Sequence, residues 1–172
     1  ISKMSGKLID IPAINTNTVT NEFCIKMKES DTICGQCYSH RMLNTYRKSC
    51  QPAWQHNSEK LSAKLLERGE IPFINSAYFR FHGHGELINR IHYRNFVAIA
   101  AANPGTNFAL WTKRKDLVRG IEKPANLILV FSNPGIDKIM DLPPAGFNKV
   151  FNNVSVEHVA ENCTGQKCRD CL

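Results

Sequence analysis

Six of the seven cysteines fall into two groups near the two ends of the chain, with spacings suited to metal ligation. The first group has the spacing C-x9-C-x2-C and consists of Cys24, Cys34 and Cys37. The second has the spacing C-x4-C-x2-C and consists of Cys163, Cys168 and Cys171. Thiolates bind soft metals, among them zinc and the iron of iron–sulfur clusters, and a C-x2-C turn lets both sulfurs face one centre. We therefore predict that each group forms a metal site or half of one.

The two groups allow more than one site. In one arrangement, each group holds a [4Fe–4S] cluster of its own. In the other, the two C-x2-C pairs, Cys34 with Cys37 and Cys168 with Cys171, share one centre. Four thiolates satisfy either a tetrahedral zinc or one closed cluster. In a zinc ribbon the pairs are close in sequence, whereas here most of the chain separates them. The spacing alone leaves iron–sulfur and zinc both open, and the preference for iron–sulfur, with zinc as the alternative, rests mainly on the family resemblance given below.

Two plainer interpretations of the cysteines fit less well. A secreted disulfide framework is disfavoured because the number of cysteines is odd and the thiols cluster in C-x2-C pairs. An inert buried thiol suits Cys50, which stands alone in a helical stretch, but not six clustered residues.

Composition and charge set the class of protein. A chain of 172 residues with 42% hydrophobic content is expected to form a single domain with a real core. No apolar run approaches the roughly 18 residues of a membrane span, and no signal-peptide pattern occurs, so we expect a cytoplasmic protein without membrane contact. The net charge of +7 permits contact with nucleic acid, a host protein or a phosphorylated small molecule, although a solvated basic face is the commoner explanation.

Alternating apolar segments and helical patterns predict an α/β fold. Strands are expected at about 18–22, 71–81, 107–112, 126–132 and 147–152, and helices at about 39–50, 53–67, 86–102, 113–119 and 135–140. Continuous apolar strands between helices are typical of a mostly parallel sheet, either open or rolled into a partial (β/α) barrel. The cysteine loop 24–37 precedes the βα units of about 71–152, and the segment 163–171 closes the domain.

Polar residues follow the predicted strands, and ligands of parallel sheets collect beyond the carboxyl ends of strands. We therefore predict a small-molecule site there, formed by Arg80, His82, Gly83, His84, Gly85, Glu86, Thr112, Lys113, Ser132 and Asn133. Burying Arg80 unpaired inside an apolar strand would be costly, so it should face Glu86 or a ligand. The two histidines suit acid–base work or metal ligation; the plainer interpretation is a solvent-exposed turn. No phosphate-binding loop, zinc-protease motif or nucleophile elbow occurs, so nucleotide hydrolysis, zincin proteolysis and hydrolase-type acyl transfer are not supported.

The first cysteine group and the GHGE turn after a strand resemble the radical S-adenosylmethionine (SAM) enzymes. Those enzymes usually have C-x3-C-x2-C, and the longer spacing of this chain occurs in the elongator catalytic subunit. The resemblance implies a [4Fe–4S] cluster with one open iron, ligated by Cys24, Cys34 and Cys37. It also implies that the amino group of SAM is contacted by Gly83, Gly85 and Glu86. Taken alone, GHGE is a tight turn.

A resemblance over more of the chain, about residues 20–172, is to the phage gene-product-88 family. It rests on the segments CGQCYSH, FRFHGHGELINRI, ALWTKRKDL, LILVFSNPG and KCRDCL. Members of that family tend to carry an acidic or Ser-Gly-Asp turn where this chain has His82–Glu86. The resemblance implies a trimmed radical-SAM-like fold with iron–sulfur ligation in a protein of phage or mobile-element origin, acting in the bacterial host cytoplasm. It implies no particular reaction: the protein is a radical or redox enzyme, or a non-catalytic binding module with structural metal sites.

Overall fold

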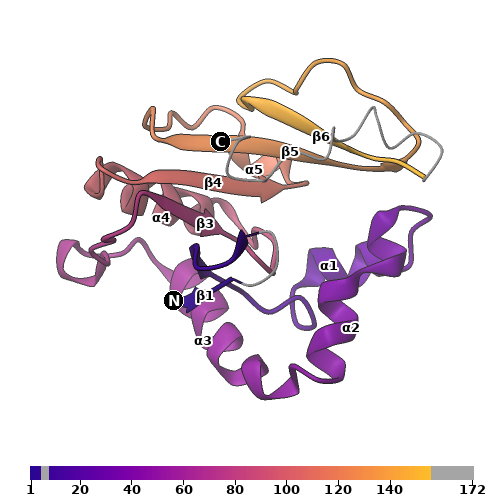
Figure 1. Ribbon diagram of the computed structural model, residues 1–172, viewed down its shortest axis with the longest axis horizontal. Coiled ribbons are helices and arrows are strands. Elements are labelled where there is room, and N and C mark those ends of the chain that lie inside the picture. Colours follow the sequence, from indigo (N-terminus) through magenta and orange to yellow (C-terminus); the bar gives the residue numbers. More distant parts are fainter. Residues whose placement is uncertain (5–7, 156–172) are drawn as a thin grey trace.

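A computed structural model of the chain describes residues 1–4 and 8–155, which form a six-stranded sheet with helices around it (Figure 1). The strands are β1 (Ser2–Lys3), β2 (Pro12–Ile14), β3 (Tyr78–Phe81), β4 (Asn107–Thr112), β5 (Leu127–Ile136) and β6 (Lys149–Asn153). The α-helices are α1 (Glu22–Lys28), α2 (Tyr38–Asn44), α3 (Gln51–Ala63), α4 (Arg90–Ala102) and α5 (Lys115–Val118). Short 3₁₀ helices are η2 (Ile33–Gln36), η3 (Lys48–Cys50) and η4 (Arg68–Glu70).

The sheet is open and its strands lie side by side in sequence order, from β1 to β6. The β1–β2 pair is antiparallel, and every later pair is parallel. Parallel neighbours need crossover connections, and the right-handed rule places those connections on the same face when the order is sequential. The predicted α/β class with an open, mostly parallel sheet is therefore confirmed for the described residues.

The core lies between the sheet and α4. Phe81 of β3 stacks on Phe96 of α4, with ring centroids 4.1 Å apart, and on Phe108 of β4 at 5.0 Å. All three rings are fully buried. The helix begins at the side chain of Asn89, which accepts from the backbone N–H of His92. Burial of this aromatic stack fixes α4 against the sheet and so fixes the direction in which β3 and β4 end.

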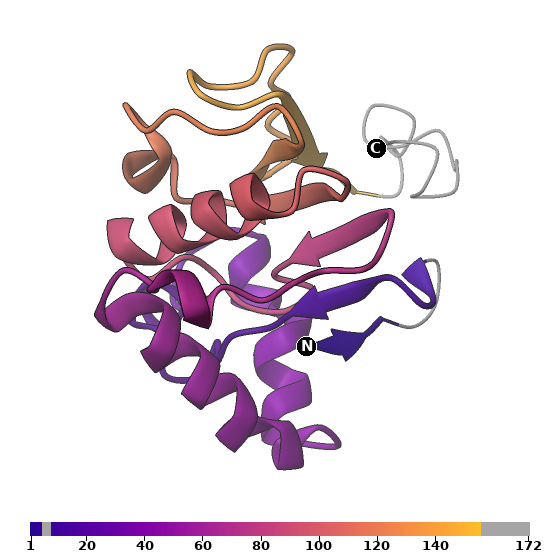
Figure 2. The ribbon, with the colours of Figure 1, turned by 90° about the vertical axis from the view of Figure 1, so that its left-hand side faces the viewer.

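The long connection between β2 and β3 returns to the core through α3, which packs beside α4 (Figure 2). Asn95 of α4 is fully buried and joins the two helices, because its amide donates to the carbonyls of Leu61 and Lys64 and accepts from the N–H of Leu66. The part of the connection that precedes α3 carries the first cysteine group to the carboxyl ends of the strands. The arrowheads of β4 and β6 in Figure 1 point towards that side, where α1 and α2 lie.

The structure corrects two predicted strands. The strand expected at 18–22 is absent, because Asn21 caps α1 instead: its side chain accepts from the N–H groups of Phe23 and Cys24. The strand expected at 71–81 is reduced to β3. The residues before it are held by side chains rather than by a ladder, with Asn103 accepting from the N–H of Ile74 and Thr106 donating to the Ile74 carbonyl.

Two helix predictions are also corrected. The helix expected over 39–50 ends at Asn44. The next helix, α3, begins at Gln51 with Pro52 in its first turn, where the missing N–H costs nothing. The turn and helix expected after Ser132 are absent, because β5 continues to Ile136 and pairs with Asn153 of β6 across a register shift.

None of the described helices has the length and apolar character needed to cross a membrane.

Candidate functional site

A pocket of about 290 Å³ lies where the carboxyl ends of the parallel strands meet α1, η2 and α2. Most of the residues predicted from the sequence line it: Cys24, Cys34, Cys37, Arg80, His82, Gly83, His84, Gly85, Glu86, Lys113 and Ser132. The fold thus brings the first cysteine group to the same edge as the polar strand ends. Thr112 and Asn133 do not line the pocket, and Cys163, Cys168 and Cys171 lie outside the described residues.

The three thiols come from α1, from η2 and from the single residue between η2 and α2. Cys24 lies in the first turn of α1, below the Asn21 cap, and the amide of Asn21 also donates to the carbonyl of Glu86 at 3.0 Å. Cys34 belongs to η2, and Cys37 lies between η2 and α2. The N–H of Cys37 donates to the carbonyl of Cys34 at 3.1 Å. All three are half-buried, free thiols. Capping and turn bonds, not apolar packing, hold α1 and η2 in place, since neither contains a buried residue.

The thiols are close enough to influence one another. Burial raises the pKa of Cys24, and the Glu86 carboxylate and the other two thiols raise it further, while Lys113 opposes them. Burial likewise raises the pKa of Cys34, against the effect of Lys113. Within residues 1–4 and 8–155, no three His, Cys, Asp or Glu side chains are arranged to hold one metal ion.

The turn after β3 is tied to the segment after β2. The His84 N–H donates to the Asn15 side chain at 2.8 Å, and the Thr16 N–H donates to the His84 carbonyl at 3.0 Å. Gly85 has a φ of +125°, and a Cβ there would lie 2.1 Å from Oγ1 of Thr16. Only glycine fits this position. The GHGE sequence is therefore a tight turn with a steric reason for its second glycine, whatever it binds.

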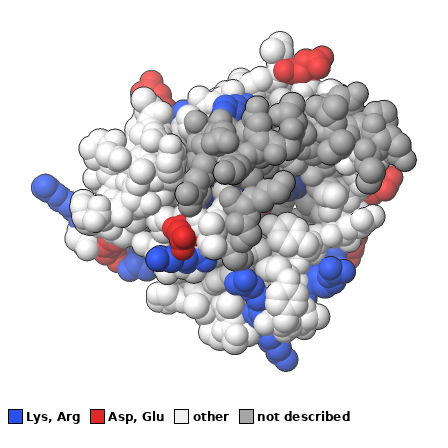
Figure 3. All heavy atoms as spheres, in the orientation of Figure 1, with Lys and Arg blue, Asp and Glu red and all other residues white. Residues whose placement is uncertain are grey.

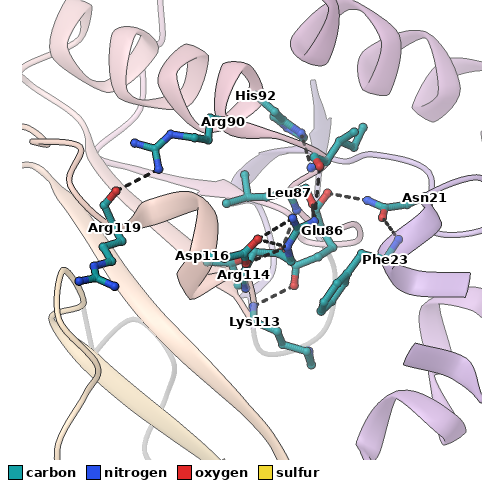
Figure 4. A network of polar contacts seen from close by, with 12 residues as sticks. Asn21, Phe23, Glu86, Leu87, Arg90, His92, Lys113, Arg114, Asp116 and Arg119 are labelled. Atoms are coloured by element: carbon teal, nitrogen blue, oxygen red, sulfur yellow. Dashed lines mark hydrogen bonds and ion pairs between the residues drawn. The ribbon is translucent and has the colours of Figure 1, made fainter. Parts of the chain in front are cut away.

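Glu86 is buried and its carboxylate is already engaged within the protein (Figure 4). Oε1 accepts from the N–H of Leu87 at 2.8 Å and from the hydroxyl of Thr112, and Oε2 accepts from the N–H of Lys113 at 2.9 Å. These bonds join the β3 turn to the end of β4. The role given to Thr112 by the structure is to hold Glu86.

Arg114 extends this network outwards. Its guanidinium donates to the carbonyl of Leu87 at 3.2 Å, forms an ion pair with Asp116 at 2.8 Å and lies over the ring of Phe23 with 4.8 Å to the centroid. Phe23 precedes Cys24 on α1, so the strand end also braces the first cysteine helix (Figure 4).

Both histidines of the turn are neutral near pH 7. His82 is 3% exposed and its edge meets the ring of His92 at 5.1 Å; burial, then the neighbouring His92 and Arg80, lowers its pKa well below the usual range. His84 stacks on Trp54 at 5.0 Å, and burial, with Arg47 and Arg80, lowers its pKa to about 4. The interpretation of both as solvent-exposed turn residues is wrong for His82, which is buried under Phe96.

The sequence did not predict the aromatic floor of the pocket, which consists of the rings of Trp111 and Phe151. Trp111 of β4 and Phe151 of β6 have ring centroids 4.8 Å apart, and the Arg80 guanidinium lies 4.8 Å from the Trp111 ring. All three line the pocket. The two-residue periodicity of β3 and β4 could have indicated this face, because Arg80 and Trp111 each alternate with core residues.

Among the described residues on the molecular face drawn in Figure 3, basic side chains are scattered among neutral and acidic ones and do not form one continuous strip. This view therefore adds no support for the predicted contact with nucleic acid.

The chain matches a known protein family. Residues 3–167 match the protein family described as gene product 88. No curated protein and no solved structure matches the chain.

Proposed function

We propose that this chain, which belongs to the gene product 88 family, is an iron–sulfur protein whose first cluster is held by Cys24, Cys34 and Cys37. The observation that carries the proposal is the gathering of these three thiols, free and half-buried, in one pocket at the carboxyl edge of a parallel sheet. That edge is where such sheets place their ligands. The predicted second group, outside the described residues, stays a prediction.

We propose a cluster rather than a single ion because the described residues contain no group of three His, Cys, Asp or Glu side chains that could hold one metal ion. In a [4Fe–4S] cube each protein thiolate ligates a different iron, so the sulfurs stand farther apart than the four ligands of one tetrahedral zinc. The pocket thiols lie close enough to influence one another electrostatically. Zinc remains the alternative that metal analysis distinguishes.

The chain supplies three thiolates and would leave one iron open. A cluster at this position would supply one-electron transfer. The residues around it position and shield it: the Asn21 cap fixes Cys24, the turn bond to the Cys34 carbonyl fixes Cys37, and the aromatic floor limits solvent on the sheet side. Lys113, which lies in the same pocket, offers positive charge near the thiolates.

The proposed chemistry is that of a reduced radical-SAM-like protein. The sequential parallel strands, the cysteine segment before β3 and the glycine turn after it support this interpretation. Glu86, however, is engaged with Leu87, Thr112 and Lys113, so contact with a SAM amino group would use only the remaining lone pair of Oε2. The thiols therefore support the cluster more strongly than the glycine turn supports SAM as its co-ligand.

Metal analysis of anaerobically purified full-length chain tests the proposal. We expect iron and acid-labile sulfide in near-equal amounts. Single Cys24→Ala, Cys34→Ala and Cys37→Ala variants should lose at least about half of both, with a matching part of the brown chromophore, and nearly all of both if the chain holds one cluster only. Cys50→Ala is the matched control, because Cys50 is also a half-buried free thiol but does not line the pocket. Full iron and sulfide in the three pocket variants, or stoichiometric zinc in their place, would show the assignment to be wrong.

A chain in which Cys163, Cys168 and Cys171 are all replaced by Ala separates one site from two. Loss of about half of the iron indicates a second cluster, and loss of all of it indicates a shared one. Reductive cleavage of SAM by the reconstituted protein then distinguishes an enzyme from a binding module: 5′-deoxyadenosine is expected of the former and not of the latter.

A further inference from the structure

The floor of the pocket has chemistry that the thiols do not use. Three side chains project from the face of the sheet opposite the core: Arg80 from β3, Trp111 from β4 and Phe151 from β6. The Arg80 guanidinium lies 4.8 Å from the centroid of the Trp111 ring, and that centroid lies 4.8 Å from the centroid of the Phe151 ring. Trp111 and Phe151 are only half-buried and line the pocket. The rings of Trp111 and Phe151 are tilted by 46° to each other, so with the Arg80 guanidinium they form an angled platform, against which a further planar ring can stack on one aromatic ring and meet the other edge-on.

The charge of the pocket favours an anion. Among the residues that the structure describes, the charged side chains that line the pocket are the cations Arg80, Lys113 and Lys28 and the acid Glu86. The Glu86 carboxylate already accepts hydrogen bonds from the backbone of Leu87 and Lys113 and from Thr112, so its charge is directed into the protein. Arginine binds carboxylate and phosphate oxygens with two parallel donors, and it keeps a stack on an aromatic ring while doing so.

We propose that the pocket binds a ligand made of a planar aromatic ring and an anionic group, with the ring packed against Trp111 and Phe151 and the anion held by Arg80 and Lys113. The ligand class deepens the proposed function and rests on it for the identification of this pocket as the functional site. Its chemistry is shared by nucleoside monophosphates and by aromatic carboxylates.

Each part of the platform has a separate expected effect. Loss of the Trp111 ring removes stacking, which for a nucleic-acid base typically costs about 10- to 100-fold in affinity. Arg80→Lys keeps the charge but loses the planar group, and should weaken an aromatic anion more than it weakens inorganic phosphate.

Isothermal titration of the full-length chain with adenosine 5′-monophosphate, adenosine, benzoate and inorganic phosphate tests the proposal. We expect adenosine monophosphate or benzoate, or both, to bind at least about 10-fold tighter than adenosine and phosphate, and to weaken by at least about 10-fold in Arg80→Gln and Trp111→Leu. Binding of the nucleotide alone identifies a phosphate ligand, and binding of benzoate alone a carboxylate. Arg68→Gln and Phe73→Leu are the matched controls, because both side chains are exposed and neither lines the pocket.

The outcomes separate this proposal from the iron–sulfur assignment. If neither ring-bearing anion binds, or if both bind equally well to Arg80→Gln and Trp111→Leu variants of native circular dichroism, the ligand class is wrong. Iron content decides the other assignment, since Cys37→Ala should lose iron while still binding the anion, and Arg80→Lys should lose affinity while keeping iron.

Discussion

Glu86 and Lys113 are joined by a hydrogen bond of 2.9 Å, from the backbone N–H of Lys113 to Oε2 of the glutamate. The bond connects the turn after β3 with the end of β4, and both residues line the pocket that contains the first cysteine group. Because Glu86 is 4% exposed, the backbone groups that it satisfies have no ready access to water. The shape of the pocket edge therefore depends on one carboxylate.

Replacing that carboxylate should destabilise the fold as well as the site. In Glu86→Gln the amide presents an NH₂ group either to the Lys113 N–H or to the Leu87 N–H, which opposes donor to donor. We expect a loss of about 1–3 kcal/mol in the free energy of unfolding, measured by urea denaturation. Glu59→Gln, on the exposed face of α3, is the control. An unchanged urea midpoint for Glu86→Gln would show that the network is not needed for stability.

Gly85 should tolerate no side chain. A Cβ at this position would meet Oγ1 of Thr16 at 2.1 Å, with a φ of +125° that other residues rarely adopt. Gly85→Ala is expected to cost at least about 2 kcal/mol of stability. Gly105→Ala is the control, because a Cβ there has nothing within 4 Å. Thr16→Ala in the Gly85→Ala background should restore part of the loss by removing the clash; no recovery would mean that backbone strain alone is responsible.

The sheet could be predicted from the sequence where strands are apolar on both faces. The range 107–112 is confirmed as β4, in which five of the six residues are buried or half-buried, so that both faces of the strand are covered. The strand at 18–22 could not be judged in this way. Thr18 and Asn21 in that range are buried and held by side-chain bonds, such as the Asn21 amide donating to the carbonyl of Glu86, and a pattern of hydrophobicity contains no signal for that.

The site was predicted in part for a similar reason. The rule that ligands collect at the carboxyl ends of parallel strands placed Arg80, His82 and Lys113 at one edge, and the structure brings them together. Trp111 and Phe151 were missed because their contact depends on the alignment of β4, β5 and β6, which the sequence does not give. The helical position of Cys24 was missed because α1 is stabilised by its Asn21 cap and has no apolar stripe.

Removal of metal should loosen α1 and η2, the elements that contain Cys24 and Cys34, more than it loosens the sheet. Neither α1 nor η2 contains a buried residue, so a bound centre would supply much of what holds them, whereas β4 and β5 are anchored in the core. Hydrogen exchange of chelator-treated protein should be faster by at least about 10-fold at the amides of 22–37 and nearly unchanged in β4. Equal acceleration in both regions would contradict a local role for the metal.

Acid should destabilise the fold through His92, which is fully buried and whose pKa is lowered by burial to about 3. An unfolded histidine binds its proton below about pH 6.5, so between that pH and about 3 the unfolded chain holds a proton that the native chain does not. Stability contributed by the neutral ring is thus complete above pH 6.5 and falls by about 1.4 kcal/mol per pH unit below it.

The variant His92→Asn tests this. It removes the titrating group but keeps an acceptor for the N–H of Ile88, which in the wild type donates to Nδ1 of His92 at 3.3 Å. Urea midpoints at pH 7.5, 6.5, 5.5 and 4.5 should therefore fall less steeply in His92→Asn than in the wild type or in His56→Asn, a substitution on the exposed side of α3. Parallel curves for all three proteins would rule out His92 as a source of the acid sensitivity.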